Sequence, residues 1–349
     1  MTGGSTLTTT PLHGVKANWR VGVQRQLAPQ SRSGSGSEMG EAPSVEDVLG
    51  RVAMFSGREL TYVPLEGGLS HQIWVVRCGA ESCVLRVLDP AVSSAGLGVD
   101  PAQEIFNTLR AAESGVGARV FEVLPDVPAI VLEFLPGRTL SGPDVREPAT
   151  LRRLTQACRR LHAGPRFGNE FSIAGKLREL LDVCRRNDLR IPDGYPGRLA
   201  TVDRIQTALD AAPLPTVPCH NDLLAANFID SGGGIRIVDY QLSGNNDPCF
   251  ELGDIAAEAD FDPDRSGALA AAYFGDESTP ALAARVRLNL VLSNVTWTLW
   301  FSVHHGLLRK PQSSFDYWTE ASVKWQKAQR DLDDPSLGRL LDLASQRSP

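Results

Sequence analysis

The sequence lacks the features that mark several large classes of protein. The chain of 349 residues has no apolar run that approaches the roughly 18 consecutive residues needed to cross a bilayer. The most apolar window, residues 288–303, is interrupted by Asn, Ser and Thr. The chain also has no run of lysine or arginine, and its formal net charge is −6. Because duplex-binding proteins concentrate positive charge, we expect neither nucleic acid as a partner nor insertion into a membrane.

Cysteine is scarce and scattered. The six cysteines include no Cys-x-x-Cys pair, so we expect reduced and mostly buried thiols, not a disulfide framework or a zinc site. The beginning of the chain has no apolar segment of the kind that a secretory signal requires. We therefore predict a cytoplasmic protein.

Residues 1–45 differ in composition from the rest of the chain. They are rich in Thr, Ser and Gly, and up to residue 37 they contain four basic residues and no acidic one. That composition is similar to an organelle transit peptide, but a disordered tail, or translation that truly begins at Met39, explains it more simply. We predict a disordered extension here and assign no structure to residues 1–43.

The next part of the chain alternates between polar and apolar residues, as strands with one buried and one exposed face do. This pattern predicts antiparallel strands and one helix within residues 46–135. The expected strands are Leu60–Leu65, Gln72–Cys78, Ser82–Val87, Arg119–Leu124 and Ala129–Phe134, and the expected helix is Asp100–Glu113. Five strands and a helix would form a small α+β lobe.

Residues 136–349 are mainly helical in pattern. The helical period predicts helices at 148–162, 174–187, 196–212, 250–258, 265–274, 280–305 and 315–330, interrupted by two short strands at 227–230 and 235–239. The fold class that we predict is α+β, with a small five-stranded antiparallel N-lobe and a larger helical C-lobe.

The densest chemical signal lies at this interruption. The sequence Cys-His-Asn-Asp occupies residues 219–222, Asn227 follows five positions after Asp222, and Asp239 closes the second strand. A hairpin would bring Asn227 and Asp239 side by side, with Asp222 on the loop before them. Oxygen ligands for Mg²⁺ next to a carboxylate base are what phosphoryl transfer requires. An ordinary polar loop with a capping Asp is the plain alternative.

These residues resemble the catalytic core of small-molecule phosphotransferases with a bilobal, protein kinase-like fold. That superfamily includes the aminoglycoside phosphotransferases and the choline/ethanolamine kinases. The resemblance implies that Asp222 is the catalytic base, that His220 orients the loop and that Asn227 and Asp239 hold Mg²⁺. It also implies an ATP-dependent kinase.

The resemblance extends into the N-lobe. Gly67, Gly68 and Ser70 look like the turn that covers the phosphates, although His71 stands where the family often has Asn. The resemblance further implies that Arg86 contacts the phosphates, that Glu104 is its ion-pair partner, and that the backbone from Glu133 to Leu135 binds adenine. Taken alone, such an arginine and glutamate are more often solvated surface residues.

The C-lobe resembles the choline/ethanolamine kinase branch. The segment from Asp239 to Glu258 and the Trp-x-x-Trp pair of Trp297 and Trp300 are similar to the motifs of that branch. Two indole rings three residues apart on a helix share a face and can hold a trimethylammonium group, with Glu258 as a counter-charge. The plain alternative is that both tryptophans fill the core. Leu242 and Ala259 stand where an aromatic is common, which leaves ethanolamine or thiamine open beside choline.

Three functions compete. The first is an ATP- and Mg²⁺-dependent kinase of a small cationic alcohol, choline first. The second is an aminoglycoside or other antibiotic O-phosphotransferase, or a thiamine kinase. The third is a pseudokinase that only binds, which the presence of Asp222, Asn227 and Asp239 disfavours.

Overall fold

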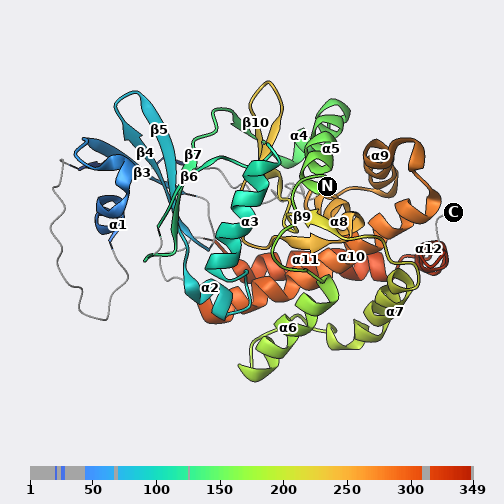
Figure 1. Cartoon of the computed structure of the whole chain (residues 1–349). Coiled ribbons are helices and arrows are strands. Elements are labelled where there is room, and N and C mark those ends of the chain that lie inside the picture. Colours follow the sequence, from blue (N-terminus) through green and yellow to red (C-terminus); the bar gives the residue numbers. More distant parts are fainter. Residues whose placement is uncertain are drawn as a thin grey trace, which may run out of the picture.

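Figure 1 shows a computed structural model of the chain, which describes residues 20–21, 25–27, 44–66, 70–124, 126–308 and 315–346. An antiparallel sheet lies at one end of the molecule, and a larger group of helices fills the other. The predicted bilobal α+β fold is thereby confirmed. No helix in the described ranges is long and apolar enough to span a membrane.

The N-lobe is built on five antiparallel strands in the order β3-β4-β5-β7-β6. The strands are β3 (Leu60–Glu66), β4 (Gln72–Cys78), β5 (Glu81–Val87), β6 (Val120–Leu124) and β7 (Ala129–Glu133). The helices are α1 (Val45–Arg51), α2 (Pro90–Ser94) and α3 (Pro101–Glu113), with a 3-10 turn at Ala53–Phe55. All five strands and the long helix were predicted from the sequence, whereas α1 and α2 were not.

One face of the sheet is buried against α1. Val76 of β4, Leu85 of β5 and Val131 of β7 lie in one apolar cluster with Val48 and Leu49 of α1. Their side chains point the same way because residues two apart on a strand share a face and neighbouring strands are in register. This packing fixes β4, β5 and β7, whose side chains also line the cleft.

Two further strands pair with the edge of β3. These are β1 (Arg20–Val21) and β2 (Arg25–Leu27), which pair antiparallel with residues 65–66 and 60–62. The sequence analysis assigned no structure to these residues, and the structure differs there. Strands of two or three residues are too short to show a hydrophobic period, so the sequence pattern did not indicate them.

The C-lobe surrounds one central helix, α10 (Pro280–Val303), which is buried on nearly every side. The other helices are α4 (Gly142–Arg146), α5 (Pro148–His162), α6 (Ile173–Arg186), α7 (Leu199–Asp210), α8 (Pro248–Glu258), α9 (Pro263–Phe274), α11 (Tyr317–Leu332) and α12 (Leu337–Ala344). Helix α10 packs against α6, α8, α11 and α12. An apolar helix of this length that other helices surround is a core element, since all its faces must be covered.

The C-lobe also contains short strands and turns. They are β8 (Arg138–Thr139), β9 (Val217–Cys219), β10 (Phe228–Asp230), β11 (Ile235–Ile237) and β12 (Gly244–Asn246), with 3-10 turns at Pro196–Arg198, Ala225–Asn227 and Gly275–Glu277 and a π turn at His304–Leu308. The predicted hairpin of β10 and β11 is confirmed, and β8 extends it. Strands β9 and β12 pair with each other and were not predicted.

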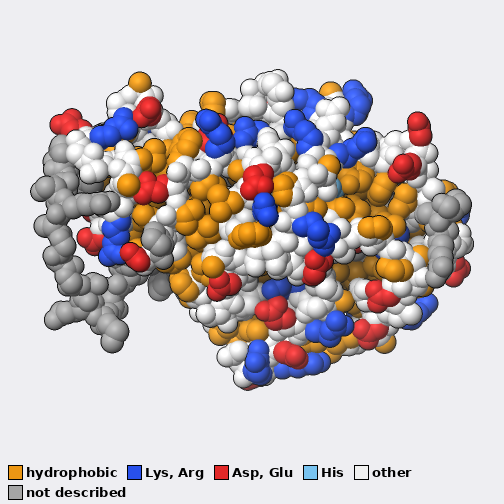
Figure 2. All heavy atoms as spheres, in the orientation of Figure 1, with side chains coloured by type: hydrophobic (Ala, Val, Ile, Leu, Met, Phe, Trp, Pro, Cys, Tyr) orange, Lys and Arg blue, Asp and Glu red, His pale blue; other side chains and the backbone are white. Residues whose placement is uncertain are grey.

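The six cysteines are all free and buried, as predicted. By contrast, some apolar side chains are exposed on α3 and β6. Phe106 and Phe121 are each about two-fifths exposed, and Figure 2 shows hydrophobic side chains gathered in the region of α3. Arg110 and Arg119 lie over these two rings at 5.2 and 5.5 Å, so the patch is partly covered by guanidinium groups.

Candidate active site

A cavity of about 380 Å³ opens between the sheet and the helical lobe. Its upper wall is formed by apolar side chains of β4, β5 and β7, and its far end by Ile229, Val238 and Asp239. Arg86, Glu104, Glu133 and Leu135, all predicted cofactor contacts, line it. An apolar slot that ends in charged groups can hold a flat heterocycle at one end and phosphates at the other.

Arg86 connects the two lobes at the polar end of this cavity. Its Nη2 lies 2.9 Å from Glu104 Oε1 on α3 and 2.5 Å from Asp239 Oδ1 in the C-lobe. The predicted ion pair of Arg86 and Glu104 is therefore present, and neither residue is solvated, since their side chains are 6% and 2% exposed. Burial alone would raise the pKa of Asp239, but the Arg86 guanidinium holds it below its usual value.

His71 supports this pair from the other side. Its Nδ1 accepts a hydrogen bond from the Asp89 backbone N–H at 3.0 Å, so its Nε2 is the protonated nitrogen and donates to Glu104 Oε2 at 3.2 Å. Glu104 is thus held by two partners. The departure from the family pattern at this position, where Asn is common, supplies an additional donor to the glutamate.

Residues 220–224, which follow β9 and carry the predicted base Asp222, form the candidate catalytic loop. Asn221 has a positive φ of 66°, and its amide donates to the carbonyls of Leu242 and Gly244, which closes the loop against the segment before β12. His220 is buried, and burial lowers its pKa, so the ring is neutral. Its Nε2 donates to Val238 O at 2.9 Å, and its Nδ1 accepts from the Asp222 backbone N–H at 3.2 Å. His220 therefore ties this loop to the strand that leads to Asp239.

Glu251 on α8 binds the backbone of the same loop. Its two carboxylate oxygens accept the backbone N–H groups of His220 and Asn221 at 2.8 and 2.7 Å. Burial by itself would raise the pKa of Glu251, but the hydrogen bond from His162 and these donors keep it below its usual value. The sequence analysis gave Glu251 no role.

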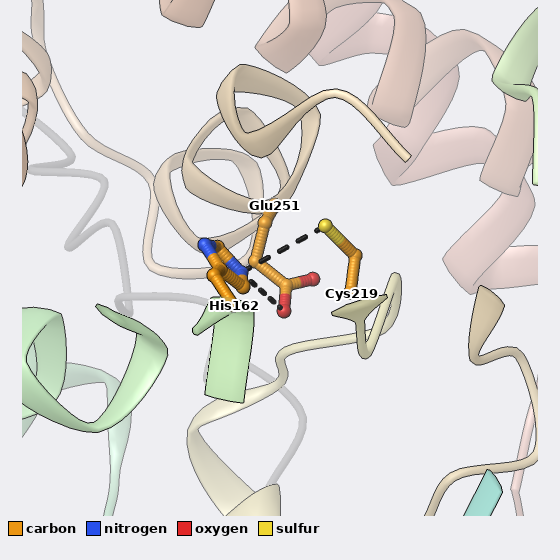
Figure 3. A group of neighbouring side chains, drawn as sticks. All are labelled: His162, Cys219 and Glu251. Atoms are coloured by element: carbon orange, nitrogen blue, oxygen red, sulfur yellow. Dashed lines mark hydrogen bonds and ion pairs between the residues drawn. The ribbon is translucent and has the colours of Figure 1, made fainter. Parts of the chain in front are cut away.

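A cluster of three buried side chains, His162, Cys219 and Glu251, lies at this point (Figure 3). His162 Nε2 lies 3.4 Å from Glu251 Oε1 and 3.7 Å from Cys219 Sγ, and its Nδ1 bonds the Tyr273 hydroxyl at 2.6 Å. The ligand atoms of the three residues lie within 4.8 Å of one another, as in a metal centre. Both oxygens of the carboxylate are already used by the loop backbone, so we assign the cluster to supporting the loop.

The hairpin brings the two predicted metal ligands together. The Val238 N–H donates to Asn227 O at 3.0 Å, so Asn227, just before β10, and Asp239, just after β11, lie at the same end of the hairpin. Asp239 has a φ of 74°, a conformation that Asp tolerates better than most residues. The Asn227 amide nitrogen donates to Asp222 O at 2.8 Å, which leaves the amide oxygen as the atom that Asn227 can offer a cation.

Asp222 lies among other charged groups. Burial and the charges of Asp254, Glu258 and Asp239 raise its pKa well above its usual value, while Lys324 acts in the opposite direction. Burial and Glu258 likewise raise the pKa of Asp254 to about 7. A carboxylate whose pKa is raised is a stronger base than a free one, which suits the predicted role.

Asp254 was also missed by the sequence analysis, which gave it no role. Its Oδ2 accepts the Leu223 backbone N–H at 2.8 Å, and its Oδ1 accepts Ser293 Oγ at 2.8 Å and Trp297 Nε1 at 2.7 Å. It therefore joins the catalytic loop to the helix that carries the Trp-x-x-Trp pair. The sequence pattern could not indicate these contacts of Asp254, because its partners lie far away in the sequence.

The predicted substrate contacts are only partly brought together. Trp297 reaches the catalytic loop through Asp254, whereas Trp300 Nε1 donates to Leu97 O at 3.0 Å and its ring packs on Phe301 and His304. Both indoles are 4–6% exposed and belong to the large core cluster of the C-lobe. Glu258 forms an ion pair with Lys324 of α11, a residue that the sequence analysis did not consider.

The remaining predicted contacts lie at the two ends of the cleft. The Glu133 side chain accepts from the Arg119 N–H at 3.1 Å, which keeps the strand end in place beside Leu135. Ser70 is buried, and its Oγ has no hydrogen-bond partner among the described residues. Gly67 and Gly68 lie outside the described residues.

Comparison with known proteins agrees with this geometry. The model of the family described as "Phosphotransferase enzyme family" matches residues 61–288. A choline/ethanolamine kinase of Rattus norvegicus is 26% identical over 231 residues, which cover 58% of this chain and 56% of that protein. A thiamine kinase of Shigella boydii is 29% identical over 133 residues, 37% of this chain and 43% of that protein. The chain thus spans about half the length of these relatives.

A solved structure is similar over a larger part of the chain. The crystal structure of a choline/ethanolamine kinase family protein from Mesorhizobium loti superposes with a TM-score of 0.71 and 28% sequence identity. The match covers 85% of this chain and 96% of that one. It therefore includes both lobes and the loops between them.

Proposed function

Because this chain belongs to the phosphotransferase enzyme family, we propose that it transfers the γ-phosphoryl group of ATP to the hydroxyl of a small cationic alcohol, choline first. The observation that carries the proposal is the buried group of carboxylates around Asp222. Asp254 and Glu258 place further acidic side chains beside the catalytic loop, where an acceptor alcohol would have to lie, and Glu258 already holds the ammonium of Lys324 there. A cationic acceptor would be attracted there and a neutral sugar would not.

The reaction needs a base at Asp222. The hydroxyl oxygen of the acceptor attacks the γ-phosphorus, the bond from phosphorus to the β-γ bridging oxygen breaks, and ADP leaves. Asp222 takes the hydroxyl proton, which becomes more acidic as the new bond forms. His220 and Glu251 hold the loop that carries Asp222, so the base is in position before substrate binds.

Mg²⁺ fits the residues at the edge of the hairpin. An amide oxygen from Asn227 and a carboxylate from Asp239 are hard oxygen ligands, and the orientation of the Asn227 amide is fixed by its bond to Asp222 O. When bound there, the ion would neutralise charge on the phosphates. Arg86 supplies a further positive charge from the N-lobe, and Glu104 holds it in place.

The choice of choline rests on three residues. Glu258 supplies a counter-charge, and the indoles of Trp297 and Trp300 are the groups that could face a trimethylammonium. Trp297 supports the proposal better, because its link through Asp254 lies beside the catalytic loop. Thiamine is a second candidate, since it too is a permanently cationic alcohol and a thiamine kinase is among the relatives. An antibiotic acceptor would also exploit acidic side chains, without the tryptophans.

The test is ATP- and Mg²⁺-dependent ADP release with choline, ethanolamine, thiamine and several aminoglycosides. Asp222→Asn removes the base, so we expect turnover to fall by about a thousandfold or more while ATP still binds. Asp264→Asn, the same change on an exposed position of α9, is the control. Release that only aminoglycosides stimulate would keep the reaction and overturn the acceptor. Undiminished turnover in Asp222→Asn would overturn the base.

A further inference from the structure

Lys324 places a positive charge among the acidic side chains that, in the proposed function, surround the acceptor alcohol. It lies on α11, which packs on α10, and its ammonium pairs with the carboxylate of Glu258 at the end of α8. The two side chains are 7% and 12% exposed, so this is a buried ion pair and not a surface one. Buried charges without a partner are costly, which explains why the pair forms in the free protein.

The charged groups around Lys324 are mostly acidic. Asp222, Asp254 and Glu258 face it from the catalytic loop and α8, and Glu320 precedes it by one turn on α11. The neighbouring Lys327 lies on the same helix but pairs with Asp260 at 3.4 Å. Lys324 therefore pairs with Glu258 beside three further acidic side chains, and a cation that took its place would meet the same acidic surroundings.

Two cations cannot both occupy the contact position on one carboxylate without strong repulsion. Lys324 is attached to the protein, so its effective concentration at Glu258 is high and it competes with any free cation. Its four-carbon stem is flexible, which lets the ammonium leave when a better-fitting cation arrives.

We propose that Lys324 is a specificity-determining residue that occupies the cation position on Glu258 in the free enzyme and must be displaced by a cationic alcohol. The inference rests on the proposed function, in which Glu258 contacts the acceptor. It narrows the substrate class to alcohols whose cationic group binds Glu258 more favourably than a tethered primary ammonium does. Lys324 thereby lowers the affinity for all cationic acceptors and leaves neutral alcohols unaffected.

The first experiment measures choline binding by calorimetry, without turnover, in the wild type and in Lys324→Met. We expect choline to bind about tenfold more tightly in the variant, a gain of about 1.4 kcal/mol. The neutral analogue 3,3-dimethylbutan-1-ol should show no gain. Lys327→Met, the same change one turn further along α11, is the matched control and should leave choline affinity unchanged. Choline binding that is unchanged or weaker in Lys324→Met overturns the proposal.

The double variant Lys324→Met with Glu258→Gln tests whether Lys324 affects choline binding through Glu258. The gain in choline affinity should vanish, because the carboxylate that it depends on is gone. A gain that persists would mean that Lys324 acts elsewhere, and the proposal would be wrong. Should Lys324→Met not fold, Lys324→Gln removes the charge and keeps a hydrogen-bond donor on a slightly shorter side chain.

A measurement on the unmodified protein is independent of any variant. Choline should free the Lys324 ammonium and raise its rate of acetylation by acetic anhydride, as read by peptide mass spectrometry. An unchanged rate under saturating choline would contradict displacement. Failure of the proposed function looks different, since a protein that transfers no phosphate to any alcohol can still show the gain in choline binding.

Discussion

The basicity of Asp222 depends on its neighbours one by one. Asp254, Glu258 and Asp239 raise the pKa of Asp222 together with burial, and Lys324 lowers it. Since a base acts only when it is ionised, the rate of phosphate transfer should fall as the pH drops through this raised pKa. Any substitution that removes a nearby negative charge should move the fall in rate to lower pH.

Glu258→Gln tests that dependence. The variant loses one negative charge and leaves Lys324 without its carboxylate partner, and both changes lower the pKa of Asp222. We expect the acid limb of the kcat profile, measured at saturating ATP and acceptor, to shift toward lower pH. Glu277→Gln, an exposed site on the 3-10 turn after α9, should leave the limb in place. A shift toward higher pH would contradict this account of the site.

Among the elements, α8 has the largest effect on the active site. It supplies Glu251 to the catalytic loop, Asp254 to Leu223 and Trp297, and Glu258 to Lys324. These three residues are spaced three and four apart, so one face of a single helix contacts the loop, α10 and α11. The helix acts as the frame on which the loop and the acceptor region are assembled.

Glu251→Gln tests this frame. The amide nitrogen of Gln cannot accept the backbone N–H that a carboxylate oxygen accepts, so one loop donor is left buried and unpaired. We expect a loss of about 1–3 kcal/mol in the free energy of unfolding and a fall in kcat that exceeds any change in KM for ATP. Glu147→Gln, an exposed change at the start of α5, is the control for denaturant melts and kinetics. A normal kcat in Glu251→Gln would remove the loop-holding role.

The sequence predicted the long strands and the short hairpin of β10 and β11, but it missed the other short strands for a physical reason. Strands such as β4 and β5 alternate over seven residues and show a clear period, whereas β8, β9 and β12 have two or three residues and show none. In the site, Asp222, Asn227 and Asp239 were found because they share one short motif. Lys324 lies 66 residues from Glu258, so only the folded chain brings them together.

For the whole molecule, the six cysteines report on the integrity of the core. Burial raises the pKa of Cys83 to about 12 and that of Cys184 to about 11, and it also raises the pKa of Cys158, Cys219 and Cys249 well above its usual value. Because the thiolate is the reactive form and all six thiols, Cys78 included, are buried away from the reagent, native protein at pH 8 should react slowly with a disulfide reagent. All six should react at once in guanidinium chloride. A fast-reacting thiol in the native protein would contradict this packing.

The ion pair between Arg86 and Asp239 has a consequence for the catalytic cycle. It joins residues 153 positions apart, one on the sheet and one beside the catalytic loop. In the free enzyme each group balances the other, so the cleft is stable without nucleotide. A metal–nucleotide complex would have to take over both partners, which reduces its net affinity. When ADP departs, the ion pair between Arg86 and Asp239 re-forms, and its free energy, lost when the nucleotide bound, is regained. The contact that weakens nucleotide binding therefore favours release of ADP.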